Sequence, residues 1–172
     1  MAQTIVLITG ANRGIGKGIM KRYLSKPNHL IIAANRNPEH PTSKALFNLP
    51  VGSGTSLVVV KLDATVETDS IAAVKELQAQ GIERLDVVIA NAGISYTWPK
   101  VSDLKMADLQ AHIDVNVYGT VRLYQATLPL LQKSAEAKFA YIGSTAGYIE
   151  VSLLFIAVFS TDADYCTVRM AL

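Results

Sequence analysis

A glycine-rich turn near the start of the chain combines residue types that suit phosphate binding. It reads Thr9-Gly10-Ala11-Asn12-Arg13-Gly14-Ile15-Gly16. Glycines let the backbone turn sharply and let a pyrophosphate approach the main chain, while the N–H groups of a following helix face the anion. The turn lies between the apolar run 5–8 and a segment with apolar residues at helical spacing, which is typical of strand, turn and helix. The pattern predicts a nucleotide-phosphate site, against the alternative of a turn without a ligand.

Two arginines lie where a further phosphate group is expected. Arg36 follows the short apolar run 30–34, about 20 residues beyond the glycines. In dinucleotide folds an acidic residue at this place bonds to the ribose hydroxyls of NAD, whereas a basic residue accommodates the 2′-phosphate of NADP. Arg36 therefore favours NADP, and Arg13 inside the glycine turn adds a second positive charge. The alternative is that both are ordinary solvated arginines.

The elements that must position these residues alternate along the chain. Apolar runs typical of buried strands lie at 5–8, 30–34, 57–62, 85–90 and 138–142. Helical patterns lie between them, at 17–24, 42–48, 68–81 and 106–133. Strands that alternate with helices in this way predict a parallel sheet covered on both faces.

The last of these helical patterns is the longest. Its apolar residues recur at helical spacing and predict one packed face, made of Leu109, Ile113, Val117, Val121, Tyr124 and Leu128. Asn116 lies beside this face. Pro129 is expected to bend or end the last turns, because proline lacks the backbone N–H that a helix interior uses.

Length and composition restrict the class of protein. With 172 residues we expect one domain that buries its own core. The net charge of +2 is spread without runs, which points to neither nucleic acid nor an anionic membrane. No apolar run approaches the ~20 residues of a membrane span, and the longest lies at 153–159. The early first strand leaves no room for a signal peptide and Cys166 is the only cysteine, so we expect a cytoplasmic protein without disulfides.

Further residues, in this order and at this spacing, resemble the short-chain dehydrogenase/reductase family over the whole chain. Besides the glycine turn, the matching marks are Asp63 after the third strand, Ala90-Asn91-Ala92-Gly93 after the fourth, Asn116, Ser144 after the fifth strand, and the stretch from Tyr165 to Arg169. Within the family, the stretch 86–94 and Pro129-Leu130-Leu131 look most like fungal polyketide ketoreductases of the norsolorinic acid ketoreductase type.

The resemblance implies a fold, a cofactor and a reaction. The fold is a Rossmann-type three-layer αβα domain over residues 1–172, with a parallel sheet in the order 3-2-1-4-5. The cofactor is NADP, used as NADPH, and the reaction reduces a ketone to a secondary alcohol in polyketide or other secondary metabolism. The partner is a small carbonyl substrate, with no nucleic acid and no membrane. In the family the long helix and the tyrosine helix usually form a subunit interface, so a homo-oligomer is one expectation and the oligomeric state stays open.

The family's roles fall on matching residues of this chain. By resemblance Tyr165 is the catalytic acid, Ser144 steadies the substrate oxygen and Asn116 holds a water of the proton relay. Arg169 stands where the family has a lysine that binds the nicotinamide ribose and favours the ionised tyrosine. The implied cofactor-binding set, with Asp63 on the adenine and no metal, is Gly10, Asn12, Arg13, Gly14, Ile15, Gly16, Arg36, Asp63, Asn91, Ala92, Gly93, Tyr165 and Arg169. The residues alone also allow Asn116 as an amide satisfied by neighbouring backbone, and Ser144 as a turn residue.

Three departures from the family bear on activity. Arg169 keeps the charge of lysine, but a guanidinium is larger, planar and effectively never deprotonated. The spacing from Ser144 to Tyr165, 165 − 144 = 21 residues, is longer than usual and includes the apolar segment 151–159. The chain ends at Leu172, within the tyrosine helix, so the family's last strands are absent and we expect the fifth strand to be an exposed edge.

Two hypotheses follow from these departures. The first is an NADPH-dependent ketoreductase. The second is a non-catalytic or degenerate NADP-binding module whose catalytic end has decayed. The sequence does not decide between a fragment, a truncated gene model and a degenerate paralogue.

Overall fold

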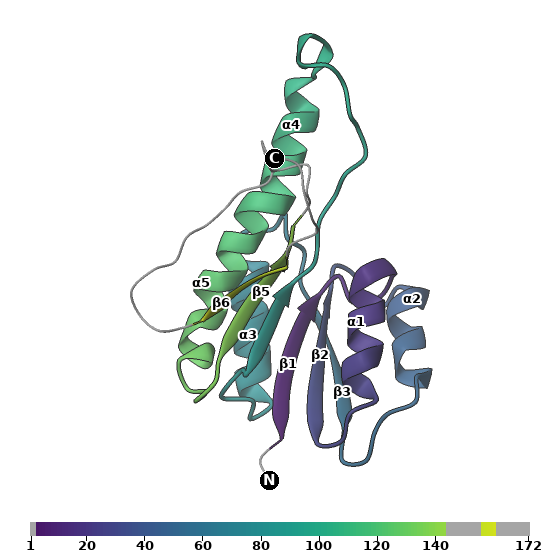
Figure 1. The fold of residues 1–172 in the computed structure, drawn as a ribbon, viewed down its shortest axis with the longest axis vertical. Coiled ribbons are helices and arrows are strands. Elements are labelled where there is room, and N and C mark those ends of the chain that lie inside the picture. The colour runs from purple at the N-terminus through teal and green to yellow at the C-terminus, as the bar shows by residue number, and fades with distance from the viewer. Residues whose placement is uncertain (1–2, 144–155, 161–172) are drawn as a thin grey trace.

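The computed structural model describes residues 3–143 and 156–160 and arranges them around one sheet (Figure 1). The strands that run parallel are β1 (Thr4–Thr9), β2 (His29–Asn35), β3 (Ser56–Lys61), β4 (Val87–Ala90) and β5 (Lys138–Ile142). Their spatial order is β3-β2-β1-β4-β5, and each neighbouring pair is parallel. The predicted Rossmann-type sheet and its order are confirmed.

The register of the strands brings the predicted site residues to one edge of the sheet. Thr9 at the end of β1 pairs with Ala34, and Asn35 at the end of β2 pairs with Lys61. On the other side of β1, Ile8 pairs with Ile89 near the end of β4. Because parallel strands finish on the same side, the turns that follow β1, β2, β3 and β4 all meet at this edge, which we call the carboxyl edge.

A sixth strand, β6 (Ile156–Ser160), pairs antiparallel with β5. Ile142 lies opposite Ile156, and Lys138 lies opposite Ser160. The expectation that β5 forms an exposed edge is therefore wrong. The apolar segment 151–159 contains the first four residues of β6, and the backbone of β6 pairs with the N–H and C=O groups on the open side of β5.

Helices cover both faces of the sheet, which confirms the three-layer arrangement (Figure 1). One face is covered by α1 (Gly14–Leu24), with α2 (Pro41–Lys44) and the 3₁₀ turn η1 (Ala45–Asn48) beside it. The other face is covered by α3 (Asp69–Ala79) and α5 (Gly119–Leu131). Successive residues of β1 point to opposite faces, so Leu7 joins the core under α3 and α5, whereas Ile8 joins the core under α1.

The predicted helix at 106–133 consists of three consecutive helical segments. These are α4 (Met106–His112), the π-helix η3 (Ile113–Tyr118) and α5, which ends two residues after Pro129. The predicted packed face is wrong in detail, because α5 fully buries Leu123 and Thr127, whereas Tyr124 and Leu128 are half-buried. A π-helix places more residues in each turn than an α-helix, so it rotates the apolar positions that follow it.

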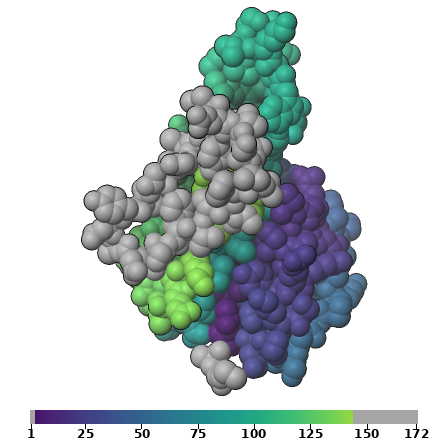
Figure 2. All heavy atoms as spheres, in the orientation of Figure 1, coloured from purple at the N-terminus to yellow at the C-terminus, as the bar shows by residue number. Residues whose placement is uncertain are grey.

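A helical arm projects beyond the sheet (Figure 1, Figure 2). It comprises the segment after β4, the short 3₁₀ turn η2 (Val101–Asp103) and α4. Trp98, Val101 and Met106 are exposed on this arm, so they add little to the cores under the sheet. Among the described residues, none of the helices is long and apolar enough to cross a membrane.

Asp86 joins three parts of the fold at the edge opposite the carboxyl edge. Its Oδ2 accepts the N–H of Ile5 at 2.7 Å, and its Oδ1 accepts Ser134 Oγ at 2.6 Å and Arg84 Nε at 3.2 Å. Burial raises the pKa of Asp86, but these hydrogen bonds and the Arg84 charge outweigh burial, so the pKa lies below its ordinary value. The ionised carboxylate therefore ties the start of β1 to the start of β4 and to the turn after α5.

We expect Asp86→Asn to lower the free energy of unfolding at pH 7 by about 2 kcal/mol, because an amide cannot accept all three hydrogen bonds. The folded pKa lies below the unfolded one, so this stabilisation is complete above the unfolded value near 3.8 and is lost as the pH falls through the folded pKa. Urea unfolding of both proteins across pH 3–7 measures the difference. The exposed neighbour provides the control, Glu83→Gln, with an expected change within about 0.5 kcal/mol. If the two proteins differed in free energy of unfolding by the same amount at every pH in this range, the lowered pKa of Asp86 would be contradicted.

Candidate cofactor site

The hydroxyl of Thr9 connects the ends of β1 and β4 at the carboxyl edge. Thr9 is buried, and its Oγ1 accepts the N–H groups of Asn91 at 3.0 Å and Ala92 at 2.9 Å. In return, Asn91 Nδ2 donates to the carbonyl oxygens of Thr9 at 2.9 Å and Gly10 at 3.3 Å. The start of the glycine turn and the segment after β4 are therefore held together by hydrogen bonds in both directions.

Two positions of the turn require glycine for different structural reasons. A Cβ on Gly16 would collide with Asn91 Nδ2 and with the carbonyl oxygen of Gly10, so only glycine lets α1 begin this close to β4. Gly14 has φ +54°, which disfavours other residues, and beyond its chain neighbours and its own helix backbone no atom lies within 4 Å of the place where its Cβ would be. The turn is thus closed toward Asn91 and open at Gly14.

The start of α1 suits an anion. Arg13 occupies the N-cap position in an extended conformation and makes no side-chain hydrogen bond to the helix. The first N–H groups of a helix have no partners within the helix, and they carry the positive end of its dipole. Since the same turn is open at Gly14, the main chain of α1 can approach a phosphate group there.

The turn that carries Arg36 is linked to the glycine turn through α2. Asn12 Nδ2 donates to Thr42 Oγ1 at 2.8 Å, and Ser43 Oγ donates to the carbonyl oxygen of Asn37 at 2.8 Å. Arg36 itself is exposed, directly after β2, and Arg13 is exposed in the glycine turn. The structure therefore places both predicted arginines in solvent around the same edge of the sheet.

Asn35 is a buried amide that the sequence did not single out. It is 1% exposed at the end of β2, and both Nδ2 and Oδ1 lack a hydrogen-bond partner among the described residues. By strand alternation its side chain lies on the face of Ile31 and Ala33, which is covered by α1. An orphaned amide beside Arg36 adds to the polar groups at this edge, and together with the uncapped start of α1 it fits a nucleotide cofactor.

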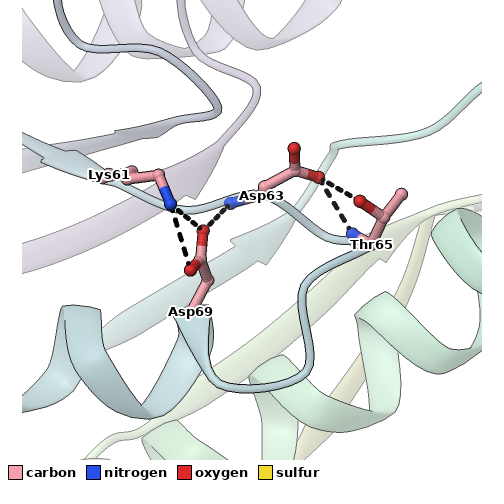
Figure 3. A network of polar contacts seen from close by, with 4 residues as sticks. All are labelled: Lys61, Asp63, Thr65 and Asp69. Atoms are coloured by element: carbon pink, nitrogen blue, oxygen red, sulfur yellow. Dashed lines mark hydrogen bonds and ion pairs between the residues drawn. The ribbon is translucent and has the colours of Figure 1, made fainter.

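Asp63 follows β3 at the same edge and belongs to the network in Figure 3. Its Oδ1 accepts the Thr65 N–H at 3.0 Å and Thr65 Oγ1 at 2.8 Å, while its own N–H donates to Asp69 Oδ2 at 2.9 Å. Lys61 Nζ also contacts the Asp69 carboxylate. Sequence reasoning missed Lys61 and Asp69. The one signal in the sequence was that Asp69 falls in the first turn of the helix predicted at 68–81, where carboxylates are favoured.

Asn116 lies in η3 and pairs with the backbone of Ile94. Its Oδ1 accepts the Ile94 N–H at 2.9 Å, and its Nδ2 donates to the Ile94 carbonyl oxygen at 3.0 Å. The Asn116 carbonyl oxygen accepts Thr120 Oγ1 at 3.0 Å. The side chain is thus an amide satisfied by neighbouring backbone, as the second reading of the sequence allowed, and it fixes the segment after Gly93 against the π-helix.

The structure brings the predicted cofactor residues of the first 93 positions to the carboxyl edge. This set is Gly10, Asn12, Arg13, Gly14, Ile15, Gly16, Arg36, Asp63, Asn91, Ala92 and Gly93. Ser144, Tyr165 and Arg169 lie outside the described residues. Within the described ranges, three or more His, Cys, Asp or Glu residues nowhere gather as a metal site.

We expect Gly16→Ala to lower the free energy of unfolding by about 2 kcal/mol, because its Cβ must push Asn91 and the Gly10 carbonyl aside. Gly18→Ala is the matched control in the same helix, since its added Cβ would meet no atom within 4 Å outside its chain neighbours and the helix backbone. This control should gain about 0.5–1 kcal/mol from helix propensity. Denaturant unfolding measures the free energy of unfolding of both variants. Equal changes at positions 16 and 18 would contradict the close contact of Gly16 with Asn91 and the Gly10 carbonyl.

Comparisons with known proteins agree with this architecture. The family model of short chain dehydrogenases matches residues 4–160. Norsolorinic acid ketoreductase nor1 of Dothistroma septosporum is 46% identical over 145 residues, which cover 83% of this chain and 54% of the relative. The norsolorinic acid ketoreductase of Aspergillus parasiticus is 41% identical over 144 residues, covering 83% of this chain and 53% of that protein.

A solved structure shows the same fold. The NADPH-bound carbonyl reductase from chicken fatty liver matches with a TM-score of 0.76 and 30% identity, over 87% of this chain and 62% of that one. The chain spans about half the length of the ketoreductases it matches. Because the family model covers nearly all of the described residues, this chain belongs to the short-chain dehydrogenase family.

Proposed function

We propose that this chain is a single NADP-binding domain over residues 1–172 and belongs to an NADPH-dependent ketoreductase that reduces a ketone to a secondary alcohol. The observation that carries the proposal is the carboxyl edge, where an open glycine turn, an uncapped helix start and Arg36 surround the ends of neighbouring strands. The names of the relatives support carbonyl reduction, and two of them name norsolorinic acid ketoreductases. Secondary metabolism is the setting that these names suggest, and the cytoplasmic location stays a prediction from the sequence.

Binding falls on residues that the carboxyl edge already holds in place. The N–H groups of the glycine turn and of the start of α1 would bind the pyrophosphate, since their carbonyl partners are absent at a helix N-terminus. The guanidinium groups of Arg36 and Arg13 would neutralise the 2′-phosphate that distinguishes NADPH from NADH. The Asp63 carboxylate would accept a hydrogen bond from the adenine amine. Asn91 would hold the end of β4 against the glycine turn through its hydrogen bonds to the carbonyl oxygens of Thr9 and Gly10.

The chemistry requires a proton donor near the substrate oxygen. NADPH held at this edge would supply the hydride for the carbonyl carbon, so the carbonyl oxygen would need a proton. We assign the proton to the hydroxyl of Tyr165 and the polarising hydrogen bond to Ser144, as the resemblance implies. Arg169 would contribute the positive charge beside the tyrosine. The Asn116 amide is already bonded to the backbone of Ile94, so this residue is left out of the proposed relay. A homo-oligomer formed through the long helix also belongs to this proposal.

The direct test of the reaction is an NADPH oxidation assay with a quinone or polyketide ketone, combined with NADPH titration of the same protein. Binding with turnover is the expected result. Tight binding without turnover would instead support the non-catalytic NADP-binding module. No binding of either dinucleotide would contradict both hypotheses.

Arg36→Ala should raise the dissociation constant for NADPH by roughly 10- to 100-fold and leave that for NADH within about threefold. The reason is that only NADPH carries the 2′-phosphate that a guanidinium at this place would bind. Fluorescence or calorimetric titration with both dinucleotides measures the effect. Arg22→Ala in the last turn of α1 is the matched control, because it removes an exposed guanidinium at the other end of that helix. Equal losses for NADPH and NADH would refute the assignment of Arg36.

A further inference from the structure

We propose that Asp69 is a positioning residue of the cofactor site, which holds the main chain of Asp63 so that the Asp63 carboxylate meets the adenine amine. This inference rests on the proposed binding of NADPH. Asp69 lies outside the glycine turn and would influence that binding through Asp63. Asp69 acts through Asp63 and would not touch the cofactor itself.

The geometry places the Asp69 carboxylate under the turn that follows β3 (Figure 3). Asp69 is the first residue of α3, and its side chain is only 10% exposed. Its Oδ2 accepts the N–H of Asp63 at 2.9 Å. Lys61 Nζ donates to Oδ2 at 2.9 Å and to Oδ1 at 3.2 Å. One carboxylate therefore bridges the last residue of β3 and the residue two positions beyond it.

This hydrogen bond forms where the chain leaves the sheet. Pairing with β2 continues one residue past β3, because the Leu62 N–H donates to the Asn35 carbonyl oxygen at 2.9 Å. The next N–H, that of Asp63, donates to the carboxylate of Asp69 instead. Since a backbone N–H that leaves the sheet needs a new partner, Asp69 decides how the chain turns at this point.

The Asp63 carboxylate is fixed from its other side by Thr65. Both the N–H and the Oγ1 of Thr65 donate to Oδ1 of Asp63, at 3.0 Å and 2.8 Å. Figure 3 shows the second oxygen of Asp63 pointing away from Thr65 and Asp69. With its backbone held by Asp69 and one oxygen held by Thr65, Asp63 presents the remaining oxygen in one direction as a hydrogen-bond acceptor.

The bond to Asp63 matters more than the ion pair. The Lys61 side chain is 58% exposed, so water and salt screen its ammonium group and weaken its attraction to Asp69. A hydrogen bond from a backbone N–H to an ionised, nearly buried carboxylate is stronger. Burial raises the pKa of Asp69, but hydrogen bonds from Lys61 and Asp63 and the charge of Lys61 outweigh it, so the pKa is lowered. Asp69 is therefore ionised at neutral pH and keeps its full capacity to accept hydrogen bonds.

The test compares NADPH with its hypoxanthine analogue, in which a carbonyl oxygen replaces the adenine amine. The unmodified chain should bind NADPH roughly tenfold more tightly than the analogue, because only the amine donates to Asp63. Asp69→Ala should reduce this preference to within about twofold, as Asp63→Ala does directly. When Asp63→Ala is already present, adding Asp69→Ala should not change the preference for NADPH over the analogue any further. Glu67→Ala is the matched control, since it removes an exposed carboxylate from the same connection and should keep the preference.

A purely structural role predicts a different result. If Asp69 only stabilises the start of α3, Asp69→Ala weakens both dinucleotides equally and keeps the tenfold preference, which overturns the proposal. Should Asp69→Ala fail to fold, Asp69→Asn decides, because its neutral amide oxygen accepts the Asp63 N–H more weakly than the carboxylate does and so holds Asp63 less firmly. A preference reduced about two- to threefold would then support the proposal, and an unchanged one would overturn it. If the unmodified chain binds neither dinucleotide, the proposed cofactor function fails as well, which distinguishes that failure from failure at Asp69 alone.

Discussion

The carboxyl edge of the sheet depends on one buried hydroxyl. Thr9 Oγ1 accepts two consecutive backbone N–H groups after β4, and Asn91 returns two hydrogen bonds to the carbonyl oxygens of the glycine turn. This connection brings α1 so close to β4 that position 16 has no room for a Cβ. The steric demand for glycine, the start of α1 and the location of the proposed phosphate site are thus consequences of the same close contact between β1 and β4.

The same principle recurs at three other places beside the sheet. At each of them a side chain accepts a backbone N–H that is not paired within the sheet. Asp69 does this after β3, Asn116 does it for the segment after β4, and Asp86 does it at the opposite edge between β1 and β4. These partners are 6, 22 and 81 positions from the groups they bind, so two of the three contacts require segments far apart in the sequence to come together in the fold.

Local patterns in the sequence were sufficient for the strands, most helices and the glycine turn, because apolar runs and glycine spacing act over a few residues. The strand order came from the family resemblance. The packed face of the helix 106–133 was predicted wrongly, since periodicity assumes a constant number of residues per turn and η3 interrupts it. The pairing of β6 with β5 was missed because a strand following a long connection has no local signal for its partner. Lys61 and Asp69 were missed for a related reason, since only the folded turn shows which backbone group they bind.

The proposed cofactor residues that the structure describes all lie before position 94, whereas Ser144, Tyr165 and Arg169 lie outside the described residues. Hydrogen bonds hold several of the described ones in place, such as those of Asn12 with Thr42, Asp63 with Asp69 and Asn91 with Thr9. The described chain then reaches Ser160 opposite Lys138, at the amino end of β5, so β6 runs away from the carboxyl edge. The proposed affinity for a dinucleotide and the proposed turnover of a ketone can therefore be tested separately. Variants at Arg36 or Asp69 report on the first, whatever the outcome for Tyr165 and Arg169, and only turnover reports on the second.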